Sequence, residues 1–261
     1  MLPEICYRRS SGCRLACMLL VCLMMSVGTV RADQLEPRWL IEVPTAGVLP
    51  QKQLAADIRF AGGNSVLAEF ELGLWSRAIL SASFGGQNLL GDLPADWNPD
   101  PGISARLRVL NETATRPAFA IGFRSQGYGR FDDSLERYER KSLGIYAVFS
   151  RNYRNPMGQG GVHFGLNRSL EDSDGDAALT GFVGSDVEFG RGVAILGEYL
   201  FAFNDDDGEA LGKGRGYLNL GIRILVGSRL AVEFDLKDVL ENNTRNQRPE
   251  KEVRVILLRG L

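Results

Sequence analysis

Cysteine is scarce in this chain of 261 residues, and its positions remove most of its structural uses. All four cysteines lie within the first 32 residues, at Cys6, Cys13, Cys17 and Cys22. The residues from 33 onward therefore cannot form a disulfide, which excludes a disulfide-stapled secreted fold.

A surplus of positive charge is also missing. The chain has 30 Lys and Arg against 32 Asp and Glu, and four of the Arg and one of the Glu lie in residues 1 to 32. The 26 positive and 31 negative side chains that remain give residues 33 to 261 a net charge of −5. This balance argues against a nucleic-acid-binding surface.

The first 32 residues have the three parts of a Sec-type signal peptide. Arg8, Arg9 and Arg14 are positively charged, 15 to 30 is an apolar run, and Ala32 follows as a small residue at a cleavage position. We expect cleavage after Ala32 and export from the cytoplasm. A retained transmembrane helix is the weaker alternative because the run is short and polar residues interrupt its end.

Regular patterning is absent from residues 33 to 51, which contain Pro37, Pro44 and Pro50. Prolines at this density break both helices and strands. The sequence therefore predicts an irregular leader that faces the periplasm.

From residue 52 onward the chain alternates apolar and polar residues, and no stretch shows a convincing amphipathic helix. The clearest case is 216 to 237, where two alternating runs flank Gly227 and Arg229 as a hairpin would. A period of two is typical of strands with one wet face. Twelve such segments occur, at 54–60, 66–74, 78–84, 103–109, 117–123, 143–149, 162–166, 179–189, 193–203, 218–226, 230–236 and 253–257.

The links between these segments alternate in length. Short links occur at 75–77, 111–116, 154–158, 190–192 and 227–229, and longer polar links lie between them. Short turns at one end and long loops at the other are typical of bacterial outer-membrane proteins. We expect residues 52 to 261 to form an all-β, antiparallel, up-and-down transmembrane β-barrel of about twelve strands in the bacterial outer membrane.

A secreted β-sandwich or a soluble lipocalin-like barrel could show the same alternation. Two features favour the membrane barrel: runs of about 9 to 11 residues match a tilted crossing, and the face opposite the apolar one is strongly charged. The expected partners of the outer face are outer-membrane lipid and lipopolysaccharide, and no cofactor is indicated.

Several segments carry a family resemblance, namely TAGVLP at 45–50, DWNPDPGISARLRVL at 96–110, AIGFRSQGYG at 120–129 and RYERKSLGIYAVFSRNY at 137–153. They resemble short, largely uncharacterised outer-membrane barrels grouped with YjbH-type exopolysaccharide-associated proteins. The resemblance implies an outer-membrane barrel linked to envelope or polysaccharide biology, and it carries no catalytic residues.

The alternation places charged side chains on the inner face. Three arginines lie on neighbouring segments, and acids with one further arginine lie on later segments; the lumen-lining set is Arg106, Arg108, Arg124, Glu198, Arg223, Glu233 and Asp235. A basic wall opposite an acidic wall would set up a field that favours polar or charged solutes. The alternative is that these charges neutralise each other in a filled interior.

The single histidine, His163, also points inward. Antiparallel pairing sets Ser150 on one side of it and Asp186 on the other, so the three could act as nucleophile, base and orienting acid. The more ordinary interpretation is a hydrogen-bonded lumen histidine. Acidic loop clusters at 172–176 and 205–208 are interpreted as solvated turns, so no metal site is expected.

These patterns lead to one preferred function and two alternatives. The preferred one is a passive pore or envelope-transport component for small polar or saccharide solutes. The second is a closed structural or interaction barrel, which a lumen blocked by ion pairs or by residues 33 to 51 would favour. The third is a membrane hydrolase that uses Ser150, His163 and Asp186; we expect the protein not to be an enzyme.

Overall fold

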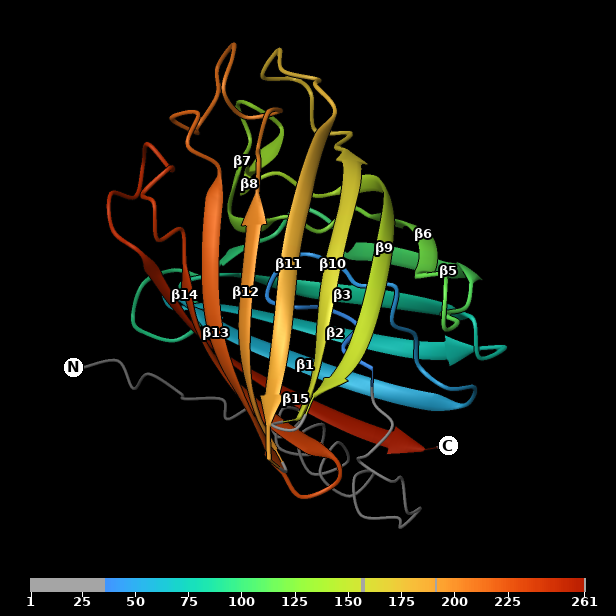
Figure 1. Ribbon diagram of the computed structural model, residues 1–261. Helices are drawn as coiled ribbons and strands as arrows, with labels where there is room; N and C mark the ends of the chain where they lie inside the picture. Colours follow the sequence, from blue (N-terminus) through green and yellow to red (C-terminus); the bar gives the residue numbers. More distant parts are fainter. Residues whose placement is uncertain (1–35, 156–157, 191, 261) are drawn as a thin grey trace, which may run out of the picture.

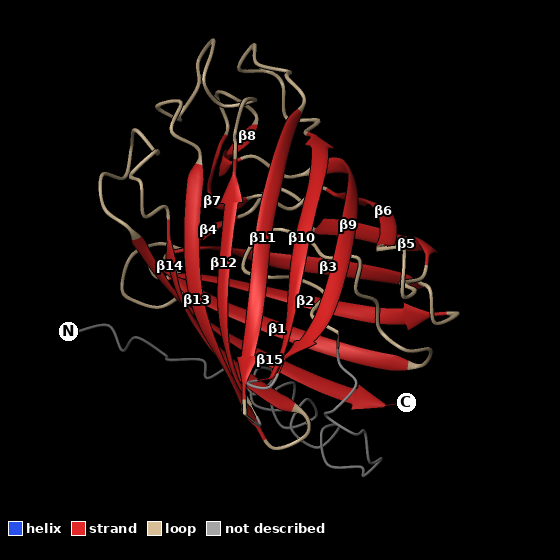
Figure 2. Cartoon of the chain, viewed as in Figure 1, coloured by secondary structure: helices blue, strands red, loops and turns tan. Residues whose placement is uncertain are grey.

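The computed structural model describes residues 36 to 155, 158 to 190 and 192 to 260. The signal peptide expected over residues 1 to 32, together with its cysteines, lies outside the described residues. Within the described ranges the ordered elements are strands joined by loops (Figure 2), and no helix there is long and apolar enough to cross a membrane.

Fifteen strands are present in the described part of the chain. Their bounds are β1 Gln53–Ala61, β2 Ser65–Leu74, β3 Ala78–Gln87, β4 Asp96–Trp97, β5 Gly102–Leu110, β6 Ala118–Arg124, β7 Tyr128–Asp132, β8 Arg137–Arg140, β9 Gly144–Asn155, β10 Gly158–Arg168, β11 Thr180–Phe189, β12 Val193–Leu200, β13 Tyr217–Val226, β14 Leu230–Lys237 and β15 Glu250–Gly260.

Twelve of these strands form a closed antiparallel barrel. Each long strand pairs with its neighbours along the chain, and β1 pairs with β15 from Gln53 opposite Gly260 to Phe60 opposite Val253, which closes the ring. The twelve strands coincide with the twelve segments expected from the alternation. The others are accessory: β4 pairs with the end of β3, and β7 and β8 form a separate hairpin in a long loop (Figure 1).

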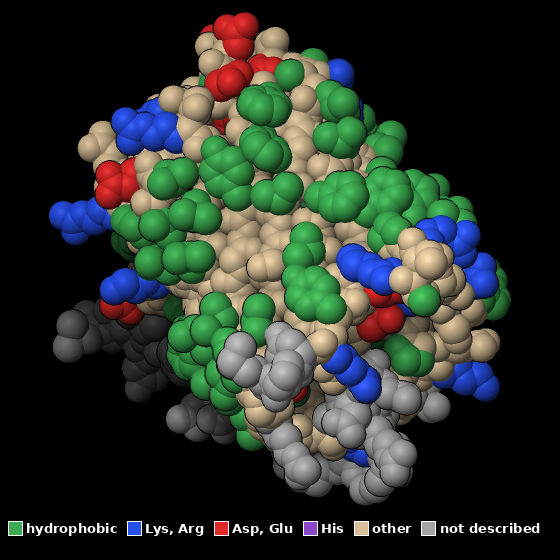
Figure 3. Space-filling model, in the orientation of Figure 1, with side chains coloured by type: hydrophobic (Ala, Val, Ile, Leu, Met, Phe, Trp, Pro, Cys, Tyr) green, Lys and Arg blue, Asp and Glu red, His purple; other side chains and the backbone are tan. Residues whose placement is uncertain are grey.

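The barrel's outer face is apolar. Side chains that alternate outward remain exposed although they are large and hydrophobic, including Leu80 at 50%, Phe164 at 49% and Ile222 at 47%. Figure 3 shows such side chains gathered over the strands, with acidic side chains at the loop end. Exposed apolar surface of this extent marks a membrane-facing protein. The fold is therefore a transmembrane β-barrel, and the sandwich and lipocalin alternatives do not describe it.

The leader occupies a different place from the one expected. The sequence analysis predicts a periplasm-facing segment over 33 to 51, whereas residues 38 to 49 lie inside the ring of strands (Figure 1), with Leu40, Ile41 and Val43 fully buried. We call residues 38 to 49 the plug. The physical reason is its composition, since these apolar side chains leave water by packing against the lumen wall.

Candidate functional site

The plug forms the main hydrophobic core of the molecule. Trp39, Leu40, Ile41 and Val43 pack with wall residues from several strands, while Val48 and Leu49 form a smaller cluster near the start of β1. In a barrel whose outer face meets lipid, the lumen is the place where a protein-like core can form. The plug supplies that core.

Glycines on the wall make room for the plug. A Cβ atom added at Gly184 would lie 2.4 Å from Leu40 Cδ1, and one added at Gly221 would lie 3.2 Å from Ile41 Cδ1. A methyl group at the first position would overlap the plug side chain, so only glycine permits this approach. The wall and the plug are thus complementary in shape.

The carboxylate of Glu198 on β12 binds the plug backbone. It accepts N–H groups from three consecutive residues, Ile41 at 2.9 Å, Glu42 at 2.8 Å and Val43 at 3.0 Å, and a fourth hydrogen bond from Asn219 Nδ2 at 2.7 Å. Hydrogen bonds to a charged group are about twice as strong as neutral ones. Glu198 therefore holds the plug at its centre.

Arginines of the wall bind the plug's carbonyl groups. Arg106 Nη1 donates to the carbonyl oxygens of Arg38 at 2.8 Å and Gly47 at 2.9 Å, and Arg223 Nη2 donates to that of Leu40 at 2.9 Å. These bonds replace the water that an irregular backbone would need, since a buried unpaired carbonyl is costly. Three further arginines do the same, with Arg108 on Ala46, Arg254 on Leu40 and Arg59 on Ile41.

The indole ring of Trp39 lies close to two guanidinium groups. The Arg106 and Arg124 guanidinium carbons are 4.6 and 4.4 Å from the ring centre. Its Nε1 donates to Glu71 Oε1 at 2.9 Å, and the same carboxylate also pairs with Arg38. Each cation–π contact contributes about 0.5 to 2 kcal/mol. Trp39 is consequently an anchor of the plug that combines cation–π contacts with a hydrogen bond to the wall.

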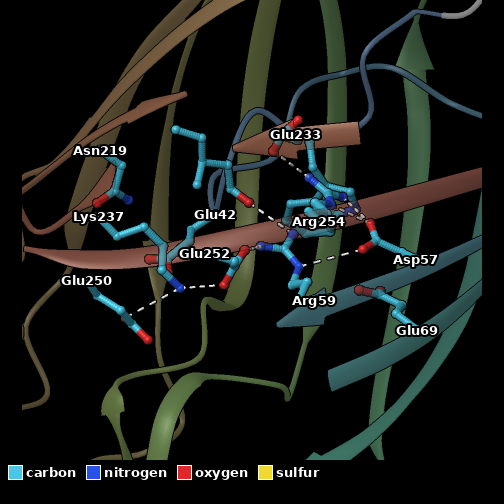
Figure 4. A network of polar contacts seen from close by, with 12 residues as sticks. Glu42, Asp57, Arg59, Glu69, Asn219, Glu233, Lys237, Glu250, Glu252 and Arg254 are labelled. Carbon is cyan, nitrogen blue, oxygen red and sulfur yellow. Dashed lines mark hydrogen bonds and ion pairs between the residues drawn. The ribbon is translucent and has the colours of Figure 1, made fainter. Parts of the chain in front are cut away.

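A network of ion pairs surrounds the plug's one inward acid, Glu42 (Figure 4). Lys237 Nζ lies 2.6 Å from Glu252 Oε2 and 3.3 Å from Glu42 Oε1, and Arg59 donates to Glu252 Oε1 at 2.8 Å. Arg140 Nη2 lies 3.0 Å from Glu42 Oε1 and is a second cation beside this carboxylate. Because the charges alternate in sign, their attraction offsets part of the desolvation cost of burying them.

The seven lumen residues expected from sequence all lie on the inner face. Arg106, Arg108 and Arg223 bind plug carbonyls, and Glu198 binds plug amides. Arg124 stacks on Trp39 and makes two 2.9 Å hydrogen bonds with Glu69. Glu233 pairs with Arg223, and Asp235 lies beside Gly221. The sequence predicts that these charges set up a field across an open pore. In the structure, six of them are engaged by the plug or by neighbouring strands, whereas neither carboxylate oxygen of Asp235 has a hydrogen-bond partner among the described residues.

The structure brings Ser150, His163 and Asp186 together. Ser150 Oγ lies 2.8 Å from His163 Nδ1, and Asp186 Oδ1 lies 2.9 Å from His163 Nε2. Ser150 faces His163 directly across β9 and β10, whereas Asp186 faces Gly161 and reaches the imidazole diagonally.

In this arrangement the serine is already in use, because Ser150 Oγ accepts the backbone N–H of Ala46 at 2.7 Å. The cavity beside it has a volume of about 10 Å³, which is the size of one water molecule rather than of a substrate. The row therefore acts as an anchor for the plug in the closed barrel.

Several functional residues were not singled out in the sequence. Arg38, Trp39 and Glu42 were missed because they belong to a segment without a period. Their partners Arg59 and Glu71 lie at inward positions of alternating segments, but the alternation alone assigns them no role. The sequence does contain a signal for the plug, namely bulky apolar residues in the leader together with glycines at inward positions such as 184 and 221.

The acidic loops above the barrel are more buried than expected. Arg137 Nη1 contacts Asp174 Oδ2 at 2.6 Å and Asp205 Oδ1 at 2.7 Å, and Lys141 also binds Asp174. Burial acts to raise the pKa of Asp174, but hydrogen bonds from Lys141, the Asp176 N–H and Arg137 outweigh it and leave that pKa lowered. These acids therefore tie the loops together instead of forming solvated turns. The described residues contain no cluster of three metal-ligating side chains.

Comparison with known proteins gives likenesses of overall shape alone. No family model and no curated protein matches the chain. Among solved structures, the KdgM porin is 10% identical (TM-score 0.49, covering 78% of this chain and 98% of that one), and the NanC porin is 8% identical (TM-score 0.44, 80% and 99%). The Salmonella typhi outer membrane phospholipase dimer is 10% identical, with a TM-score of 0.39 and coverage of 89% and 99%. At such scores these likenesses assign neither a substrate nor an activity.

Proposed function

We propose that the protein is an outer-membrane pore for small polar solutes, saccharides among them, which its own plug closes. One observation carries the proposal. The twelve strands complete their ring of backbone hydrogen bonds without the plug, which contributes no strand to the barrel. The plug can therefore leave the lumen without breaking the barrel.

The wall that the plug covers is suited to polar solutes. With the plug displaced, the guanidinium group of Arg106 on β5 would face water from one side of the lumen, and Arg223 and Glu198 on the paired strands β13 and β12 would face it from the other. Barrels of eight strands are filled by their own side chains, and those of sixteen or more strands enclose a channel. A twelve-stranded barrel emptied of its plug lies between these cases, and its charged wall favours small polar solutes over apolar ones.

A second candidate function is a closed structural or interaction barrel of the envelope. The observation that favours it is the number of charged contacts on the plug, above all the hydrogen bonds from three consecutive plug N–H groups to Glu198. In that case the long loops would meet a partner or lipopolysaccharide. The resemblance to YjbH-type proteins is compatible with both functions through envelope polysaccharide biology.

A reversible lock on the plug tests the proposal. Ala46 N and Ser150 Oγ are 2.7 Å apart, and a chain cleaved after residue 32 has no other cysteine. The double variant Ala46→Cys, Ser150→Cys can therefore join the plug to the wall by one disulfide. We expect discrete conductance steps in planar bilayers from the reduced variant and from the wild type, and none from the oxidised variant.

A chain with Ser150→Cys alone is the matched control and should conduct under both conditions. A folded wild-type barrel that never conducts, over a range of voltage and ionic strength, would overturn the proposal and favour the closed barrel.

A further inference from the structure

A polar cup opens at the loop end of the barrel. Its volume is about 370 Å³, within the range of sites for small ligands. Four parts of the chain form it: the turn after β1, the end of β3 with Asp96, the β7–β8 hairpin, and the segment from Asp238 to Glu250.

All the charged side chains of the cup other than Glu139 already have partners. Arg130 Nε lies 2.9 Å from Asp96 Oδ2, and Arg140 Nη2 lies 2.7 Å from Glu250 Oε2. The carboxylate of Asp238 is occupied by backbone N–H groups of its own loop. A charged ligand would have to break these pairs, so the cup favours an uncharged one.

Unused amide groups surround the same space. The side chains of Gln87, Asn88 and Asn246 line the cup and make no hydrogen bond with any residue that the structure describes. An amide offers two donors and an acceptor. Arg140, which is buried at the base of the cup, also has an Nε without a hydrogen-bond partner among these residues. The cup thus presents several donors and acceptors that no protein group uses.

We infer that this cup binds an uncharged saccharide. Sugar hydroxyl groups donate and accept at once, as the free amides do, and they require no net charge. The cup-lining residues include no aromatic side chain on which a sugar ring could stack, so binding is weak and exchange is fast, as entry into a pore requires. The inference deepens the proposed function, and it rests on that function for the statement that the bound sugar enters a pore.

A single side chain, that of Arg140, connects the cup to the plug. Arg140 Nη2 contacts Glu250 on the cup side and Glu42 of the plug at 3.0 Å. A saccharide that hydrogen-bonds the Glu250 carboxylate from the cup would compete with the guanidinium group that also contacts the plug's acid. Ligand binding and plug position therefore share one guanidinium group.

The test is a titration of the folded full-length barrel in detergent with maltose and lactose, followed by NMR of the side-chain amides. We expect saturable shifts of Asn and Gln signals with dissociation constants in the millimolar range. The variants Asn88→Ala and Asn246→Ala should each weaken binding about threefold to tenfold, the effect of losing one hydrogen bond. Gln247→Ala is the matched control, because Gln247 is an exposed amide of the same loop that does not line the cup.

Circular dichroism checks that each variant has folded. Absence of saturable shifts with both sugars, or equal binding by wild type and both cup variants, would overturn the inference, as would tighter binding of a disaccharide that carries a carboxylate. Because the titration records binding without conductance, its failure would leave the proposed pore standing, and a non-conducting barrel could still bind the sugar.

Discussion

The carboxylate of Glu198 accepts the backbone N–H of Glu42 at 2.8 Å, and thereby joins the barrel wall to a segment 156 residues earlier in the chain. This contact shows what the inward charges do in the structure. They serve as a binding site for an irregular peptide whose backbone groups would otherwise be buried without partners. The functional question is therefore how firmly the wall holds the plug.

Removal of the central anchor should loosen the plug. The Glu198→Ala variant leaves the N–H groups of Ile41, Glu42 and Val43 without their acceptor, at a cost of about 1 to 3 kcal/mol for each group that stays buried. We expect hydrogen exchange of these three amides, measured by mass spectrometry or NMR, to accelerate at least about tenfold. The control is Glu188→Ala, because Glu188 makes no hydrogen bond to the plug in the described residues. Unchanged exchange in Glu198→Ala would show that the carboxylate is not an anchor.

A larger side chain on the wall should also loosen the plug. A Cβ at Gly184 would lie 2.4 Å from Leu40, whereas a Cβ at Gly197, on the neighbouring strand, would meet nothing closer than Leu220 Cδ2 at 3.7 Å. Gly184→Ala should therefore destabilise the closed state by about 1 to 3 kcal/mol, as is typical of overpacking, and should raise the open probability in planar bilayers. Gly197→Ala should behave as the wild type does. Identical gating in the two variants would contradict the packing of Leu40 against this wall.

The sequence was sufficient for the barrel because alternation encodes it directly. Each strand separates lipid-facing from inward residues with a period of two, and the three-residue turn after Val226 correctly places Arg223 opposite Glu233. The plug could not be predicted in the same way. Trp39 and Ile41 lie in a segment without a period, and what holds them is a set of side chains from distant strands.

A substitution of Ser150 distinguishes an anchoring role of Ser150, His163 and Asp186 from a catalytic one. Ser150→Ala removes the acceptor of the Ala46 N–H, so exchange of that amide should accelerate by about five- to tenfold or more, in line with the cost of an unsatisfied buried donor. Hydrolysis of phospholipid or of a nitrophenyl ester should be the same for wild type and variant. Esterase activity that is present in the wild type and lost in Ser150→Ala would show that the row is catalytic.

The loop layer should weaken in acid. The pKa of Asp174 is lowered by its hydrogen bonds to Lys141 and Arg137 against the effect of burial, so its stabilising contribution is present above the unfolded value of about 3.9 and is lost as the pH falls below it. Loop proteolysis of the wild type should therefore increase between about pH 4 and pH 2.

The variant Asp174→Asn provides the comparison for this acid transition. It should be cleaved faster at pH 7, because Arg137 and Lys141 then face a neutral amide, although Arg137 keeps its ion pair with Asp205. It should also respond less to acid. A wild type whose loops are equally resistant at both pH values would contradict the assignment.

The most direct test of the account is the conductance of a barrel whose plug has been replaced. In this variant residues 38 to 49 become a Gly/Ser segment of the same length and Glu198 becomes Ala, which keeps the connection to β1 but removes Trp39, every other anchoring side chain of the plug and the carboxylate that binds its backbone. The account predicts long-lived open channels in planar bilayers from the variant and mostly closed ones from the wild type. A folded variant that stays closed, or one whose conductance and open probability equal those of the wild type, would show that the plug does not control the lumen.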